Sequence, residues 1–225
     1  MSTDEPPGRP LTIFLSSPGD VAEERRLARK VLQRLQRTPL LKGKVDIDVV
    51  SWDDPDAPAP MFATLTPQEA VNRGLPKPSE CDLTVVILWS RMGTPLSKPP
   101  KADGSRYLSG TEWEYEDAVN AGKPVLLYRR TSDPQVSLRD PDLQEKLKQQ
   151  DLVDQFFERF KSPDGTLTGD YTTYETPSEL EKRLAQDVES YLRDQLDGIG
   201  EVQALPDPLQ RLLVRRWFRT ACAVR

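Results

Sequence analysis

The chain alternates between short apolar runs and longer segments in which apolar residues recur about every three or four positions. The runs have strand length and lie at 11–17, 45–52, 81–89 and 125–128, with a weaker one at 170–174. The helical spacing covers 18–35, 110–121, 142–160 and 176–196, and a shorter helix is predicted at 67–73. Strands that alternate with helices predict a doubly wound parallel sheet, the three-layer α/β/α fold class.

The run CDLTVVILW at 81–89 is nearly all apolar. A strand of this kind is buried on both faces, so we expect it in the middle of the sheet. Ligands of doubly wound sheets bind at the carboxyl ends of the strands. We therefore expect function in three loops: after Ser17, after Trp52, and from Ser90 to Ser109.

The first predicted helix is amphipathic. Its apolar face consists of Val21, Leu27, Ala28, Val31, Leu32 and Leu35. The opposite, polar face includes Glu24 and Arg25.

The two ends of the chain differ from its middle in composition. Residues 1–10 contain three prolines and two acids, which predict a flexible leader before the α/β domain at 11–196. Glycines and prolines predict a linker at 197–208. The segment 209–225 has five arginines, no acid and interleaved apolar residues, which predicts a basic amphipathic helix. We expect this helix either to dock on a partner, a membrane or a following domain, or to pack against its own domain.

Composition limits the function classes. The chain is 36% hydrophobic and 30% charged, and its net charge of −5 argues against general binding to nucleic acid or an anionic membrane. No stretch reaches the roughly 18 apolar residues of a membrane span. Histidine is absent, which excludes Ser-His-Asp and Cys-His catalysis and imidazole metal ligands. Cys81 and Cys222 lie far apart and predict neither a disulfide framework nor a metal site, so we expect a cytoplasmic location.

The turn after the first strand, SSPGD, is the first candidate site. Backbone N–H groups at a strand-to-helix turn can bind a phosphate, and the candidate ligand residues are Ser16, Ser17 and Gly19. An ordinary helix start, with Ser17 as N-cap and Pro18 in the first position, explains the same residues. Both interpretations stay open.

The loop directly after the central strand holds the second candidate. Arg91 can bind a phosphate or carboxylate through its guanidinium, and Gly93 lets a ligand approach the backbone closely. The alternative is a surface turn with a solvated arginine.

The segment SGTEWEYEDA at 109–118 is the strongest candidate. Glu112 fits a capping box with Ser109, and it shares with Glu116 a face that can simply be solvated. Glu114 points elsewhere, so we expect it to face inward or toward the strand ends and to be partly desolvated. Near the helix N-terminus its ionised form suits a nucleophile or a stabiliser of a cation. The candidate ligand residues beside it are Ser109, Gly110, Thr111 and Trp113.

Three segments together carry a resemblance to a known family: LTIFLSSPGDVAEERR, VVILWSRMGTP and SGTEWEYEDAVNAGKPVLLY. Over roughly residues 10–196 they resemble a TIR-like domain family of unknown function that stands at the front of NACHT and other STAND NTPases. TIR NAD glycohydrolases share the pattern that Glu114, Ala118 and Gly122-Lys123 form here. Nucleoside deoxyribosyltransferases carry a related block, which fits Gly110, Glu114 and Ala118. In both enzyme groups that glutamate works at an N-glycosidic bond.

The resemblance implies a flavodoxin-like or TIR-like domain that serves as a signalling or effector module in prokaryotic immunity. It implies Glu114 as the catalytic residue and NAD or a related nucleotide as substrate, with no cofactor and no metal. It also implies self-association or an NTPase or signalling partner. Two other functions stay open: a non-catalytic module that oligomerises or recruits partners, and a nucleotide sensor that binds without cleaving.

Overall fold

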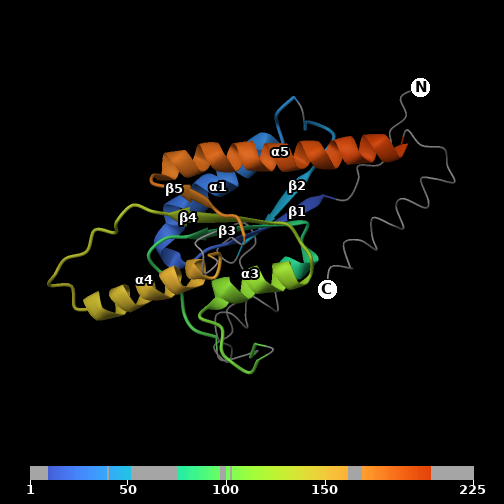
Figure 1. Ribbon diagram of the computed structural model, residues 1–225. Coiled ribbons are helices and arrows are strands. Elements are labelled where there is room, and N and C mark those ends of the chain that lie inside the picture. The colour runs from blue at the N-terminus through green and yellow to red at the C-terminus, as the bar shows by residue number, and fades with distance from the viewer. Residues whose placement is uncertain are drawn as a thin grey trace.

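The computed structural model describes residues 10–39, 41–51, 75–96, 100–101, 103–161 and 169–203 of the chain (Figure 1). In this part of the chain, five parallel strands form one sheet in the order β2-β1-β3-β4-β5. The strands are β1 (Leu11–Ser16), β2 (Ile47–Val50), β3 (Leu83–Leu88), β4 (Val125–Arg130) and β5 (Thr172–Tyr174). The helices that follow them are α1 (Ala22–Leu35), α3 (Gly110–Asn120), α4 (Leu143–Glu158) and α5 (Pro177–Gln203). Two single-turn helices, η1 (Gly19–Val21) and η2 (Pro78–Glu80), complete the described elements.

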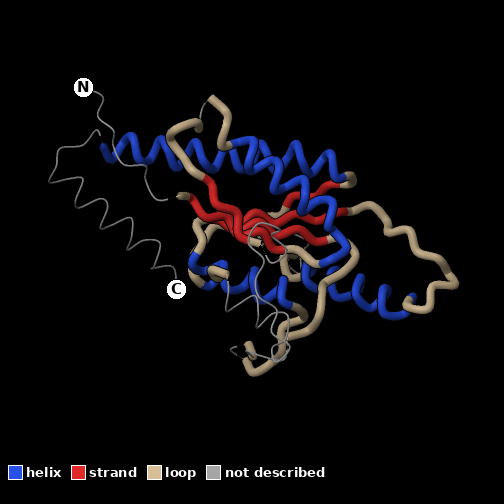
Figure 2. Tube along the Cα trace, turned by 180° about the vertical axis from the view of Figure 1, so that it is seen from behind, coloured by secondary structure: helices blue, strands red, loops and turns tan. Residues whose placement is uncertain are grey.

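The sheet lies between two layers of helices (Figures 1 and 2). Helices α1 and α5 cover one face, and α3 and α4 cover the other (Figure 1). The predicted three-layer α/β/α fold with a doubly wound parallel sheet is therefore confirmed.

Strand β3 is the centre of the sheet, as its composition predicts. It pairs with β1 on one side and β4 on the other, and all six of its residues are buried. Because both faces are covered by helices, nearly every position of this strand has to be apolar.

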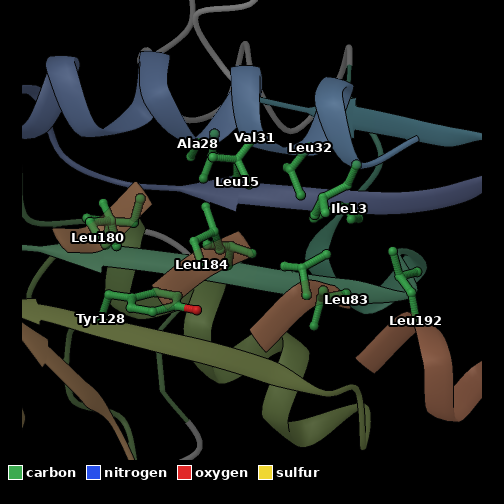
Figure 3. Packing of buried hydrophobic residues seen from close by; sticks show 14 of the residues in the cluster. Ile13, Leu15, Ala28, Val31, Leu32, Leu83, Tyr128, Leu180, Leu184 and Leu192 are labelled. Carbon is green, nitrogen blue, oxygen red and sulfur yellow. The ribbon is translucent and has the colours of Figure 1, made fainter. Parts of the chain in front are cut away.

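Each face of the sheet has its own core. Under α1 and α5, the side chains of Ile13 and Leu15 pack with Val31 and Leu184 (Figure 3). Under α3 and α4, strand residues pack with Met92 and an aromatic group of α4; this second core contains Val86, Leu88, Met92, Leu127, Val153, Phe156, Phe157 and Phe160. Full burial of such a side chain contributes about 1.5–3 kcal/mol, so these two cores hold the layers together.

Helix α3 begins and ends where its sequence predicts. The Ser109 hydroxyl is the N-cap and accepts a 3.1 Å hydrogen bond from the Glu112 N–H. At the other end, Gly122 adopts φ +67°, and the Lys123 N–H donates to the Ala118 carbonyl over 3.0 Å. A left-handed glycine just beyond the last turn satisfies the free carbonyls of a helix end.

The start of α1 differs from the prediction. Ser17 is not an N-cap: the turn η1 comes first, no side chain caps it, and α1 begins at Ala22. The apolar face of α1 is as expected, but Glu24 and Arg25 are buried and not on a solvated face. Glu24 pairs with Arg130 of β4 and Arg25 binds the turn after β1, and the spacing within one helix does not encode these partners.

Helix α5 is longer than expected. It continues past Leu196 to Gln203, so residues 197–203 of the predicted linker are helical. The helices in the described ranges include none that is long and apolar enough to cross a membrane. The following predictions lie outside the described residues: the leader at 1–9, the functional loop expected after Trp52 over residues 52–74 with its short helix at 67–73, the linker at 204–208 and the basic segment at 209–225.

Candidate functional site

Strands β1 and β3 form the point where the strand order reverses. In the order β2-β1-β3-β4-β5, the strand that follows β1 in the chain lies on one side of this pair, and the strands that follow β3 lie on the other side. Helix α1, which follows β1, covers one face, whereas α3, which follows β3, covers the other (Figure 1). In sheets of this order the ligand crevice lies at the carboxyl ends of this strand pair. The end of β1 is Ser16, and Ser90 follows β3 closely.

Ser16 and Glu114 meet at this edge. The Ser16 hydroxyl donates a 2.5 Å hydrogen bond to Oε2 of Glu114, and the two side chains are 0% and 4% exposed. Ser16 is the last residue of β1, and Glu114 lies little more than one turn into α3. The prediction that Glu114 faces inward is confirmed by its burial.

Ser17 is held by the guanidinium of Arg25. Arg25 Nη1 donates to the Ser17 hydroxyl over 2.6 Å, to the Ser17 carbonyl over 3.3 Å and to the Pro18 carbonyl over 3.0 Å. The guanidinium, at 3% exposure, uses its fixed donors to fasten the turn after β1. Ser17 is thus part of a buried contact between α1 and its own entry loop.

Asp20 joins the loops that follow β1 and β3. Its Oδ2 accepts hydrogen bonds from the Ser90 N–H over 3.0 Å and from the Ser90 hydroxyl over 3.1 Å. Burial raises the pKa of Asp20 above 3.8, and the bonds from Ser90 oppose that rise. The other oxygen, Oδ1, is buried and has no hydrogen-bond partner among the described residues.

The loop after β3 also contacts the start of α3. A Cβ placed on Gly93 would stand 3.2 Å from the Ser109 Cβ and 4.0 Å from the Pro18 Cβ. The position has φ +111°, which favours glycine. Gly93 therefore brings the N-cap of α3 and the turn after β1 together.

The remaining predicted residues have different surroundings. Arg91 is exposed next to Ser90, and Gly19 is exposed with nothing described within 4 Å of where a Cβ would stand. Thr111 and Trp113 are buried in the first turn of α3, and Gly110 is half-buried. The structure thus brings Ser16 to Glu114 and Gly93 to Ser109.

The face of α3 that carries Glu112 and Glu116 is engaged in ion pairs and is not simply solvated, although simple solvation is one of the two interpretations of its sequence. Glu112 is 1% exposed and pairs with Lys101 over 2.8 Å and with Arg159 over 3.0 Å. It also accepts a hydrogen bond from the Leu108 N–H, so it does not simply complete a capping box. Glu116 pairs with the same two cations, over 3.1 Å and 2.8 Å. The cluster joins the loop before α3 to the end of α4.

Sequence reasoning missed a second buried ion pair near this edge. Arg130 Nη1 lies 2.8 Å from the Glu24 carboxylate, and the guanidinium lies 4.0 Å from the centre of the Trp89 ring. The Trp89 Nε1–H donates to the Ser132 carbonyl over 2.7 Å. Nearby, burial raises the pKa of Tyr174, whose hydroxyl has no partner among the described residues. No local sequence pattern marks these residues, because the contacts join α1 to the ends of β3 and β4.

Within the described ranges, no group of three or more histidine, cysteine, aspartate or glutamate side chains is placed to hold a metal ion. The polar groups at the β1–β3 edge include the carboxylates of Glu114 and Asp20, several hydroxyls, the buried Arg25 and the exposed Arg91. This set is suited to binding a polar ligand and to placing a carboxylate beside an electron-poor carbon.

A protein-family model described as a domain of unknown function, DUF4062, matches residues 12–189. Among solved structures, the CMP N-glycosidase BcmB of Clostridium botulinum is similar at 17% identity and a TM-score of 0.30, covering 77% of this chain and 97% of that chain. A likeness at this level bears on neither the ligand nor the activity of this chain. No curated protein matches.

Proposed function

The chain belongs to the DUF4062 family, a domain family of unknown function, and we propose that this member binds NAD or a related nucleotide and cleaves its N-glycosidic bond. The observation that carries the proposal is the buried pair of Ser16 and Glu114 at the carboxyl end of β1. The Glu114 carboxylate lies beside the β1–β3 switch point, where doubly wound folds bind ligands.

The chemistry needs one carboxylate and no histidine. When the bond between the ribose carbon and the nicotinamide nitrogen breaks, nicotinamide leaves with the electron pair and the carbon becomes cationic. The Glu114 carboxylate stabilises that centre or captures it as an ester. Water then adds to the carbon and releases a proton to solvent, giving the free sugar hydroxyl; where the ester has formed, its bond to the carbon breaks and the Glu114 carboxylate leaves with the electron pair. Nicotinamide is already cationic in NAD and needs little protonation to leave.

Ser16 holds the carboxylate in place. Its hydroxyl hydrogen bond fixes one oxygen of Glu114, and a hydrogen bond to an ionised acceptor is stronger than one between neutral groups.

The phosphates would bind at the loops beside this pair. Arg91 is an exposed cation directly after β3, and its guanidinium matches the geometry of phosphate oxygens. The N-terminus of α3, at Ser109 and Gly110, favours negative charge. We extend the proposal to a TIR-like signalling or effector role in prokaryotic immunity, supported by the motif at Glu114, Ala118 and Gly122-Lys123.

A second function, nucleotide binding without cleavage, is favoured by one observation. Glu114 is only 4% exposed, so protein atoms cover its carboxylate. In a nucleotide sensor, a buried carboxylate of this kind stabilises the fold around the ligand site and does not react with the ligand.

Incubation of concentrated protein with NAD, with measurement of free nicotinamide, tests the proposal. We expect release by the wild type and none by Glu114→Gln, with nearly unchanged melting, because the amide oxygen of glutamine can still accept from Ser16. Glu158→Gln is the matched control, since the Glu158 side chain is 61% exposed and its pair with Lys161 contributes little. Release that persists in Glu114→Gln would refute the catalytic assignment. Binding of NAD without release would support the sensor, and no binding would support the interaction module.

A further inference from the structure

Gln149 is a buried polar residue on α4 that the proposed chemistry does not use. It is 7% exposed, although residues 144–148 just before it are exposed. Its side-chain Oε1 accepts hydrogen bonds from the Met92 N–H over 3.1 Å and from the Gly93 N–H over 3.0 Å. A carbonyl oxygen has two lone pairs, so these two bonds use its full accepting capacity.

The two amides it binds have no strand or helix to satisfy them. Met92 is 0% exposed and lies in the core between the sheet and α4, and Gly93 has φ +111°. A buried amide without a partner is costly, so the local path of the chain here depends on an acceptor from another element. Gln149 supplies that acceptor across a separation of 57 residues.

These bonds fix one side of Arg91, and Asp20 fixes the other. Ser90 donates its N–H and its hydroxyl to Asp20, whereas Met92 and Gly93 donate to Gln149. Arg91 stands between the two anchored points with its own side chain exposed. Gly93 in turn lies against Ser109, the N-cap of α3, the helix that carries Glu114.

We propose that Gln149 is a positioning residue, which holds the Met92–Gly93 backbone so that Arg91 is presented to the phosphate of the ligand beside the start of α3. The link to the ligand rests on the proposed function. The two hydrogen bonds from the Met92 and Gly93 amides to Gln149, called the clamp below, are observed independently of that function. Gln149 does not reach Glu114 in this scheme, so it affects binding of the nucleotide more than the bond-breaking step.

Three variants separate these roles. Gln149→Leu removes the acceptor at nearly constant volume. Gln149→Glu combined with Glu145→Gln keeps an oxygen acceptor for both amides and is the rescue, because exchanging the two side chains does not place two carboxylates against each other on α4. Glu145→Ala is the matched control, because it removes only the partner of the Gln149 Nε2–H, at 3.0 Å, and leaves the clamp intact.

Amide hydrogen exchange measures the clamp without any ligand. In Gln149→Leu we expect the Met92 and Gly93 amides to exchange faster by about tenfold or more, with β3 amides such as Leu88 unchanged. Cleavage by trypsin after Arg91 should accelerate in parallel. Glu145→Ala, and Gln149→Glu combined with Glu145→Gln, should behave like the wild type. Equal exchange at Met92 and Gly93 in Gln149→Leu and the wild type would overturn the clamp.

Titration with NAD tests the link to the ligand. Gln149→Leu should raise the Kd and KM for NAD by about tenfold while kcat changes little, and Gln149→Glu combined with Glu145→Gln should keep the wild-type values. If the wild type binds NAD and Gln149→Leu binds it equally well, the positioning role is wrong even when exchange is faster. If the wild type binds no NAD, the proposed function fails, and the exchange and trypsin results still decide whether Gln149 positions this loop.

Discussion

The hydroxyl of Ser16 and the carboxylate of Glu114 are joined by a 2.5 Å hydrogen bond across 98 residues of sequence. The bond connects the end of β1 to the first turns of α3, on the α3 face of the sheet. Its two partners come from motifs that are separate in sequence. Their contact joins an N-terminal strand to a downstream acidic helix.

Ser16→Ala removes the buried hydrogen bond that the Ser16 hydroxyl donates to Glu114. We expect the variant to lose about 1–3 kcal/mol in the free energy of unfolding, because a buried carboxylate loses a donor. Nicotinamide release should fall as well. Urea unfolding and the nicotinamide assay check the two effects.

Thr84→Val is the control for Ser16→Ala. The Thr84 hydroxyl is buried on β3 without a partner among the described residues, so its loss should leave stability equal or higher. Equal losses of stability in the two variants would show that the Ser16 bond contributes nothing specific.

Glu112→Gln should be strongly destabilising, more than the loss of a helix cap. The carboxylate is 1% exposed and pairs with Lys101 and Arg159, so the variant leaves a buried cluster short of one negative charge. We expect a cost of about 2–3 kcal/mol, below the range for fully buried pairs because the two cations are partly exposed. Glu116→Gln should cost less, since Glu112 still binds both cations. Thermal unfolding of the two variants side by side gives the comparison, and a larger loss for Glu116→Gln would contradict it.

Gly93→Ala combines two costs. Alanine is strained at φ +111°, and its Cβ would stand 3.2 Å from the Ser109 Cβ. Gly104→Ala isolates the first cost, because Gly104 has φ +81° and nothing within 4 Å of a Cβ. We expect Gly93→Ala to lose about 1–3 kcal/mol and Gly104→Ala about 1 kcal/mol. Chemical unfolding measures both, and equal losses would mean that the contact with Ser109 does not constrain the loop.

Asp20→Asn should change how stability depends on pH. Burial raises the pKa of Asp20 in the folded protein above the ordinary 3.8, so the folded state binds this proton more tightly than the unfolded state. The stability from this group is fully present below 3.8 and is lost as pH rises through the higher folded pKa. The asparagine variant has no such loss, so relative to the wild type it should gain stability between a pH near 3.8 and neutral pH. Urea unfolding at both pH values tests this, and a constant difference between the proteins would contradict it.

Much of the fold follows from local patterns in the sequence. The apolar run that includes Leu83 to Leu88 predicts the central strand, since only a strand covered on both faces excludes polar residues so fully. Ser109 and Gly122 mark the ends of α3, because helix caps depend on the backbone conformation and hydrogen bonds of a few neighbouring residues. The spacing within α3 also predicts that Glu114 faces inward.

The sequence by itself thus determined the order of strands and helices, the central position of β3 and the inward side of α3. Only the tertiary structure decided that Ser16 is the partner of Glu114, that Arg25 binds Ser17, and that Gln149 holds the backbone at Met92 and Gly93. The physical reason is the sequence distance over which each effect acts. Periodicity and capping involve residues only a few positions apart along one element. A hydrogen bond or ion pair between buried side chains of different elements depends on how those elements pack, and the pattern within either element does not name its partner.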